Sequence, residues 1–338
     1  MLQVRLPANR PKARRYSVDL LLGEFLGLAY DVIREERPDV AITAEGRTLH
    51  IADRFFATAD AAWLTPEALP VRPLPRWDLT GSPLEATPLT PDLPVLYGSP
   101  PWWREEGDDL WLGLDVFGSA FFLLTRYEEA VLPDRDRHER FPAEASLAVQ
   151  EGFLDRPLVN EYLELLWRAI RRLWPGLTRK ERAYRVLLSH DVDDPFCTAF
   201  RSGFHVCKST AGDLVKRRSP ALAFQRLAGA VRVRQGRPEC DLCNTFGLIM
   251  DLSERRGWQS CFNFITDHTA GALDGRYAID HPWIRGLLRQ VHQRGHEIGL
   301  HPSYHTFLRP DRIKGECDRL CAAVAAEGIT QTSFGGRQ

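Results

Sequence analysis

Two histidines and a group of aspartates have the residue types of a metal centre. The segment GLHPSYHTF places His301 and His305 four residues apart, and SHDVDDP contains Asp191, Asp193 and Asp194. Two imidazoles at that spacing can meet on one side of a helical turn and chelate a divalent metal. Together with one Asp they would leave a position for water, which is the pattern of a catalytic metal site. The metal would lower the pKa of that water, and a second Asp would accept its proton.

Each motif has a simpler interpretation when it is taken alone. Asp residues often cap helices or close turns, and surface His pairs at this spacing arise by chance. The two motifs together favour a site, because both are expected at strand ends. His296 stands at the start of the expected strand HEIGL. Since five residues of strand span about 16 Å, His296 is interpreted as a scaffold residue.

The elements that would position these residues alternate between strand and helix from residue 184 onward. Such alternation predicts a parallel sheet or a βα barrel. In these folds the carboxyl ends of the strands carry the chemistry. The expected strands are 184–189, 259–266, 296–300 and a last start at 331–336, and the expected helices are 243–257, 282–295 and 309–328.

The first half of the chain has a different pattern. Its expected helices are 17–36, 115–131 and 156–174, its short strand pieces are VAIT and TLHIAD, and a Pro-rich stretch from 66 to 101 should be extended. The segment PGLTRKERAY, residues 175–184, breaks the last helix with Pro, Gly and charge. We therefore expect an α+β accessory domain at 1–178 and a second domain at 183–338.

Composition excludes several classes of protein. The chain has 338 residues, is 44% hydrophobic and carries a formal net charge of -1, which argues against a dedicated nucleic-acid binder. The basic N-terminus has no apolar segment behind it, so no secretory signal is predicted. No run reaches the roughly 18 apolar residues of a membrane span. The seven cysteines are an odd number without framework spacing, and we expect a cytoplasmic protein with reduced thiols.

One cysteine pair has the spacing of half a zinc knuckle. Cys240 and Cys243 form CDLC, and a second pair, Cys317 and Cys321, has CxxxC spacing. A four-Cys site would have to join pairs about 75 residues apart in the sequence. The pattern favours small buried thiols at the start of a helix instead.

Four segments of the second half carry a family resemblance. VLLSHDVDD, GWQSCFNFIT, RGHEIGLHPSYHT and GGRQ occur in this order on βα units. With them the chain from 184 to 338 resembles the NodB-like polysaccharide deacetylase family. The resemblance implies a distorted (β/α) barrel that removes N-acetyl or O-acetyl groups from glycans. DVFGSAFFLLTRYEE and GFLDRPLVNEYLELLW resemble the domain that precedes the catalytic half in a bacterial subgroup of long members.

The resemblance also implies roles for particular residues. Asp191 resembles the general base, and Arg337 resembles the arginine that orients it. His301 and His305 match the HxxxH that holds the metal. The commonest form of the first motif has adjacent Asp residues, whereas this chain reads Asp-Val-Asp-Asp. Some branches of the family use an Asp-x-Asp form, so Asp193 is the expected metal-binding Asp, with Asp194 in reserve. Zn²⁺ suits two His and one Asp, and Co²⁺ or Ni²⁺ would also fit.

The sequence departs from the family pattern in two places. It ends at Gln338, directly after the third motif, so the barrel is expected to be incomplete and the chain to be a fragment or to need a partner for the missing half. No residue matches the general acid. The basic insertion at about 196–239 is expected to be a solvated helical excursion, with a patch for an anionic glycan, or for the phosphates of a lipid- or nucleotide-linked sugar, as the alternative.

The hypothesis that joins these observations is metal-dependent deacetylation of a polysaccharide or glycan precursor. The expected substrate is an acetylated glycan or a lipid- or nucleotide-linked sugar, with no nucleic acid and no membrane span. Two alternatives stay open. The chain could be a catalytically incomplete glycan-binding or scaffolding protein, or it could hydrolyse another non-peptide C–N bond with the same metal chemistry.

Overall fold

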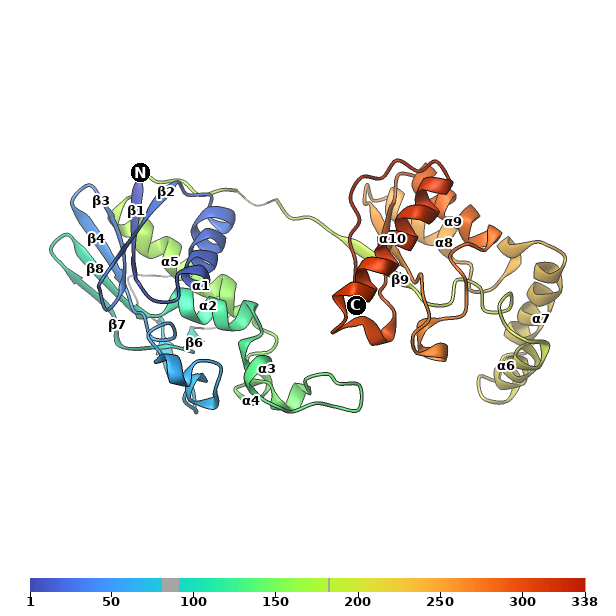
Figure 1. The fold of residues 1–338 in the computed structure, drawn as a ribbon, viewed down its shortest axis with the longest axis horizontal. Coiled ribbons are helices and arrows are strands. Elements are labelled where there is room, and N and C mark those ends of the chain that lie inside the picture. The colour runs from blue at the N-terminus through green and yellow to red at the C-terminus, as the bar shows by residue number, and fades with distance from the viewer. Residues whose placement is uncertain (81–90, 182, 338) are drawn as a thin grey trace. The chain divides into compact units, whose positions relative to one another are not determined.

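The computed structural model describes residues 1–80, 91–181 and 183–337. The chain forms two compact units, Met1–Arg182 and Ala183–Gln338, which are called the N-terminal and the C-terminal unit below (Figure 1). The division falls inside the segment 175–184, where Pro, Gly and charge break the helical pattern. Each unit has its own hydrophobic core.

The N-terminal unit is built on a mixed six-stranded sheet with the order β2-β1-β3-β4-β8-β7. The β1/β2 and β4/β8 pairs are parallel, and the other neighbours are antiparallel. Two further short strands, β5 and β6, form a separate antiparallel pair. The strands are β1 Leu2–Pro7, β2 Tyr30–Glu35, β3 Val40–Ala44, β4 Arg47–Ile51, β5 Arg76–Asp78, β6 Asp92–Pro94, β7 Gly98–Glu106 and β8 Asp109–Leu114.

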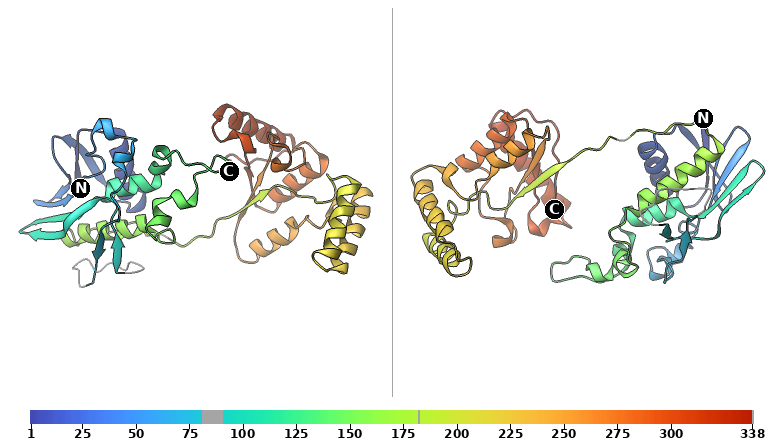
Figure 2. Two further views of the ribbon diagram at one scale, coloured as in Figure 1. Left: turned by 90° about the horizontal axis from the view of Figure 1, so that it is seen from below. Right: turned by 180° about the vertical axis from the view of Figure 1, so that it is seen from behind.

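Helices cover one face of this sheet (Figures 1 and 2). Helix α5, Leu158–Leu173, packs on β4 and β8, as its amphipathic sequence predicts. The expected helix 115–131 is divided into α2, Val116–Leu124, and α3, Tyr127–Val131, because Arg126 takes a left-handed conformation with φ of 54° between them. The other helices of the unit are α1 Pro11–Val18, the π-helical segment Asp19–Phe25, α4 Leu147–Gln150 and the short turns Asp60–Ala62, Pro66–Ala68 and Ala143–Ala145.

The expected helix 17–36 is wrong beyond Phe25. The helix stops there, and β2 follows at Tyr30–Glu35 in parallel pairing with β1. Gly27 has a φ of 67°, and a Cβ at this position would lie 2.7 Å from Lys180 Cβ. The close approach and the left-handed backbone both require glycine, and the pairing with β1 then overrides the helical pattern.

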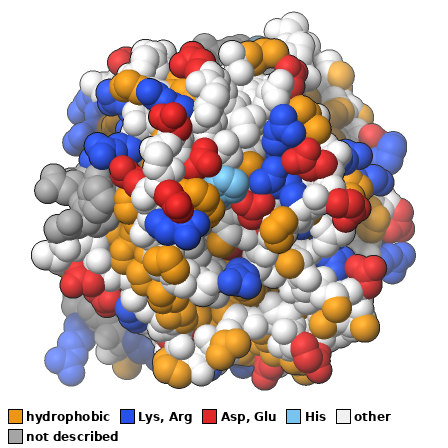
Figure 3. Space-filling model, turned by 90° about the vertical axis from the view of Figure 1, so that its left-hand side faces the viewer, with side chains coloured by type: hydrophobic (Ala, Val, Ile, Leu, Met, Phe, Trp, Pro, Cys, Tyr) orange, Lys and Arg blue, Asp and Glu red, His pale blue; other side chains and the backbone are white. Residues whose placement is uncertain are grey.

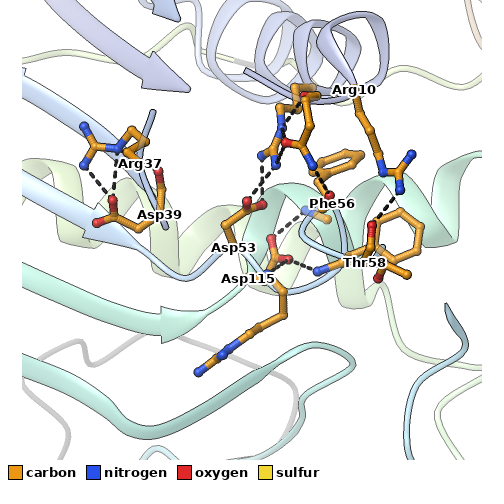
Figure 4. Close-up of polar contacts among 12 residues, drawn as sticks. Arg10, Arg37, Asp39, Asp53, Phe56, Thr58 and Asp115 are labelled. Atoms are coloured by element: carbon orange, nitrogen blue, oxygen red, sulfur yellow. Dashed lines mark hydrogen bonds and ion pairs between the residues drawn. The ribbon is translucent and has the colours of Figure 1, made fainter. Parts of the chain in front are cut away.

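Buried charges hold the N-terminal unit together (Figure 4). The guanidinium of Arg14 makes two hydrogen bonds, of 2.8 and 2.7 Å, to the carboxylate of Asp53, and both side chains are buried. Asp115 caps α2 by accepting from Gly118 N–H, and it also accepts from the backbone N–H groups of Arg54 and Phe55. Burial, helped by the negative charge of Asp53, raises the pKa of Asp115 to about 7.

The surface of the chain shows no single sign of charge on the face drawn in Figure 3. Acidic and basic side chains are interspersed there, and apolar side chains gather toward the lower part of the view. This mixture agrees with the formal net charge of -1.

The C-terminal unit contains three parallel strands in the order β11-β10-β9. Phe262, Phe264 and Ile298 on these strands are fully buried beneath the helices of the unit. An isolated parallel bridge joins Leu300 to Gly336 where a fourth strand is expected. The elements are β9 Leu188–Val192, α6 Gly203–Val215, α7 Pro220–Arg234, the turn Pro238–Cys240, α8 Phe246–Glu254, β10 Ser260–Phe264, the turn Gly271–Asp274, α9 Pro282–Gln293, β11 Glu297–Leu300, the turn Tyr304–Thr306 and α10 Pro310–Ala326.

The predicted α/β class is confirmed at this level. The residues described by the structure form an open parallel sheet and not a closed barrel. The first strand begins at Leu188 and not at the predicted residue 184, because pairing with β10 starts at the Leu188–Ser260 pair. Within the described part of the chain, no helix has the length and apolar character that a bilayer crossing requires.

Candidate functional site

Asp191 is held in place by the strand beside it. The parallel register sets Asn263 of β10 opposite Asp191 of β9 and Gly299 of β11. Asn263 is buried, and its Nδ2 donates a 3.1 Å hydrogen bond to Asp191 Oδ1. A Cβ at Gly299 would lie 2.1 Å from Asn263 Oδ1, so a glycine there leaves room for the amide that orients the carboxylate. The sequence patterns did not single out Asn263 or Gly299.

Arg337 reaches the same carboxylate from the far end of the sequence. The backbone N–H of Arg337 donates to the carbonyl oxygen of Leu300 at 3.0 Å, which continues the bridge at Gly336. From there the guanidinium Nε lies 3.6 Å from Asp191 Oδ2, and Nη1 donates to Ser189 Oγ at 3.1 Å. The expected pair of Asp191 and Arg337 is therefore close in space.

His301 faces Asp193. Its Nδ1 lies 3.0 Å from the carbonyl oxygen of Arg337, which can only accept, so Nδ1 carries a proton. Nε2 lies 3.3 Å from Asp193 Oδ1. When the imidazole is neutral, the lone pair of Nε2 faces the carboxylate, and the contact is favourable only with a proton or a cation between the two atoms. Nitrogen and oxygen ligands of a tetrahedral zinc stand about 3.3 Å apart. Metal-binding histidines usually donate their other N–H to a carbonyl or carboxylate in this way.

The other predicted ligands lie apart from this pair. His305 is exposed on the turn Tyr304–Thr306, and its ring packs edge-on against Tyr304. No hydrogen bond of its ring nitrogens occurs within the residues that the structure describes. Asp194 forms an ion pair with Arg201 instead of facing His301. The structure thus brings together Asp193 and His301 but does not gather His305 with them.

Buried polar groups fix the turn that follows β11. Ser303 is fully buried, and both its N–H and its Oγ donate to the carboxylate of Glu316 on α10. Asp274 accepts from Tyr304 N–H at 2.6 Å.

Tyr277 connects the ends of β9 and β10, because its hydroxyl donates to Val192 O and accepts from Ile265 N–H, each at 2.7 Å. These supports come from distant segments, so no local pattern in the sequence could have identified them.

The remaining polar residues near the strand ends have structural contacts. His296 is buried, and its Nδ1 accepts from Ser260 N–H at 3.1 Å, which agrees with its interpretation as a scaffold residue. Asp267 pairs with Arg319 at 2.6 Å. Both ring nitrogens of His268 lie within 3.1 Å of backbone carbonyl oxygens in its own loop.

The basic insertion contains two helices that pack side by side, α6 and α7 (Figures 1 and 2). The carboxylate of Asp213 is buried between them and binds Arg217 at 2.7 Å and Arg226 at 2.6 Å. A cavity of about 390 Å³ lies beside these helices, and among its lining residues are Asp194 and Cys197 from the loop after β9.

A second group of metal-ligating side chains lies beside this cavity. It consists of Cys197, Asp241 and Cys243, whose possible ligand atoms all lie within 4.8 Å of one another. The expectation of buried thiols at a helix start is only partly right, because Cys243 precedes α8 and faces Cys197 from another loop. A pairing of Cys243 with Cys197 was not predicted, since the two are far apart in sequence.

Comparison with known proteins assigns the first half of the chain. The sequence profile of a family of unknown function, DUF7033, matches residues 2–175. The chain belongs to the DUF7033 family. The match coincides with the N-terminal unit, and the candidate site lies outside it. No curated protein and no solved structure matches the chain significantly.

Proposed function

We propose that this DUF7033 protein is a metal-dependent deacetylase, and that its C-terminal unit forms the first strands of a NodB-like barrel. The observation that carries the proposal is the contact of Asp193 Oδ1 with His301 Nε2 at 3.3 Å, with Nδ1 already committed to a carbonyl oxygen. The adjacent carboxylate, Asp191, has the arginine partner that the family resemblance implies, at 3.6 Å. Both features lie at the carboxyl ends of parallel strands, where α/β proteins carry their chemistry.

Two of the three expected metal ligands are in place to bind a divalent metal. Asp193 and His301 would supply two ligands, and His305 would supply a third after its exposed side chain turns inward. When bound, a zinc ion polarises the acyl oxygen and lowers the pKa of a bound water. Zinc suits this nitrogen and oxygen donor set, and cobalt or nickel would also bind.

The other residues of the site would handle the proton. Asp191 would accept it from the attacking water as general base. Asn263 and Arg337 keep the carboxylate in one orientation, since they bind different oxygens of it. The proposed substrate is an acetylated glycan or a sugar linked to a lipid or a nucleotide, and the product is acetate.

The test is acetate release by the full chain supplied with Zn²⁺ or Co²⁺. The probes are an oligomer of N-acetylglucosamine and an O-acetylated oligosaccharide. Asp191→Asn and His301→Ala should abolish release, whereas Cys207→Ser, an exposed thiol outside the site, should retain it. Release that persists in both site variants would refute the assignment. Glycan binding without release in the wild type would favour the non-catalytic scaffold.

A further inference from the structure

Two loops of the C-terminal unit bring two thiols and a carboxylate together away from the strand-end site. Cys197 lies after β9, and Asp241 and Cys243 lie before α8. The Sγ of Cys197 is 3.2 Å from Asp241 Oδ1, and the ligand atoms of all three residues lie within 4.8 Å of one another. None of the three has a role in the proposed deacetylation.

The spacing of these atoms is that of ligands around one ion. With zinc–sulfur bonds of about 2.3 Å and zinc–oxygen bonds of about 2.0 Å, a tetrahedral site places sulfur about 3.5 Å from oxygen and about 3.8 Å from a second sulfur. The 3.2 Å contact between Cys197 and Asp241 is close to the first of these separations. A metal can therefore enter with small side-chain movements.

The carboxylate is fixed before any ion binds. Asp241 is only 4% exposed and accepts backbone N–H groups from Cys197 at 2.8 Å, Thr198 at 2.9 Å and Cys243 at 2.9 Å. These bonds hold both cysteine backbones around one carboxylate, as the outer hydrogen bonds of a metal site do. The Cys197 thiol donates to Asp241, and a metal would replace that proton.

The surroundings supply access and charge balance. The cavity of about 390 Å³ is lined by both Cys197 and Cys243, so that water can fill a fourth position. Two thiolates and one carboxylate would carry a charge of about -3, which a divalent ion reduces to about -1. Arg226 Nη1, at 3.6 Å from Cys197 Sγ, offsets the remainder.

We propose that Cys197, Asp241 and Cys243 form a zinc-binding site with water in the fourth position. The ion would clamp the loop after β9, which also carries Asp193, to the segment before α8. The proposal is independent of the deacetylase assignment, because it concerns different ligands and needs no substrate.

The first test is a titration of the reduced full chain with Co²⁺. Thiolate ligands give cobalt a charge-transfer absorption in the near ultraviolet, which ligation by His and Asp alone does not. The band should appear in the wild type, saturate at one equivalent in His301→Ala, persist in Cys240→Ser, and disappear in Cys197→Ser/Cys243→Ser. A folded, reduced wild type without the band would overturn the proposal, as would a band retained in the double variant.

A second test does not depend on the folding of the double variant. Alkylation of the zinc-loaded wild type, followed by peptide mapping, should leave Cys197 and Cys243 unmodified, and a chelator should make both reactive. The exposed Cys207 should be modified with and without zinc. Asp241→Asn should weaken zinc protection at least tenfold. Equal alkylation of Cys197 and Cys243 with and without zinc would contradict the site.

Discussion

Two buried aspartates of the N-terminal unit and one exposed aspartate at a strand end of the C-terminal unit have opposite surroundings. In the N-terminal unit, Asp53 and Asp115 are buried, and their oxygens are occupied by a guanidinium and by backbone N–H groups. In the C-terminal unit, the side chain of Asp193 is 62% exposed and faces Nε2 of His301 at 3.3 Å. A buried carboxylate with all its partners stabilises a fold, whereas an exposed one at a strand end remains available for a ligand.

The difference follows from desolvation. Removing one partner of a buried ion pair leaves a charge in a poorly solvated place, which costs several kcal/mol. Exposed pairs are screened by water and contribute little to stability. Substitutions of the buried Asp53 or Asp115 should therefore change stability, whereas substitution of the exposed Asp193 should change ligand binding while the fold persists.

The largest expected effect is the loss of the buried ion pair. Asp53→Ala leaves the guanidinium of Arg14 buried without a counter-ion, and should lower the free energy of unfolding by about 3–5 kcal/mol. Glu105→Ala is the matched control, because it breaks the exposed pair with Arg172 and should cost about 1 kcal/mol or less. Denaturation followed by tryptophan fluorescence is the measurement, since seven of the nine Trp residues lie in this unit. Equal costs for the two variants would remove the contrast between buried and exposed carboxylates.

The next effect is a pH dependence of the N-terminal unit. The pKa of Asp115 is raised from 3.8 to about 7 in the folded chain, so the folded state binds the extra proton between these values. Its contribution to stability is therefore largest below pH 4 and is lost as the pH rises to about 7, by at most about 4 kcal/mol. Urea denaturation at several pH values, compared with Asp115→Asn, isolates this residue. A wild type and a variant with parallel pH profiles would contradict the raised pKa.

A smaller effect is expected at Gly299 in the C-terminal unit. Gly299→Ala would press a Cβ against Asn263 and should cost about 1–3 kcal/mol, and it should also displace the amide that orients Asp191. Gly286→Ala, on α9, is the control, because the nearest atom to its Cβ would be the end of the Arg289 side chain at 3.8 Å. It should be neutral or stabilise the helix slightly. Thermal melts and acetate release of both variants are the measurements. Unchanged stability and unchanged acetate release in Gly299→Ala would show that the Asn263 hydrogen bond to Asp191 is dispensable.

The sequence predicted best the elements with strong local patterns. Helix α5 was expected at 156–174 and occurs at Leu158–Leu173, and α9 was expected from Pro282 and begins there. The prediction of one helix over 17–36 was wrong in its second half, because β2 is defined by its pairing with β1 and not by local periodicity. Pairing between strands distant in sequence has no signature inside one segment.

The same limit explains which parts of the site could be predicted. The rule that chemistry lies at strand ends, together with the family resemblance, was enough to place Asp191 near Arg337 and Asp193 near His301. The direction of the His305 side chain depends on the turn after β11, which Ser303 and Glu316 fix through buried hydrogen bonds. The proximity of Cys197 and Cys243 depends on the path of two loops. The CDLC motif pairs Cys243 with Cys240, whereas in the structure Cys243 lies beside Cys197.

The account depends most on whether Asp193 and His301 hold a metal. The most direct measurement is the zinc content of the reduced full chain, by mass spectrometry after dialysis against zinc, for the wild type and for Asp193→Asn/His301→Ala. Both residues are partly exposed, so the double variant should stay folded, with a stability change of about 1 kcal/mol or less. The account predicts that the wild type holds one more zinc per chain than the variant, whatever the cysteine site contributes to both. The same zinc content in the two folded proteins would contradict it.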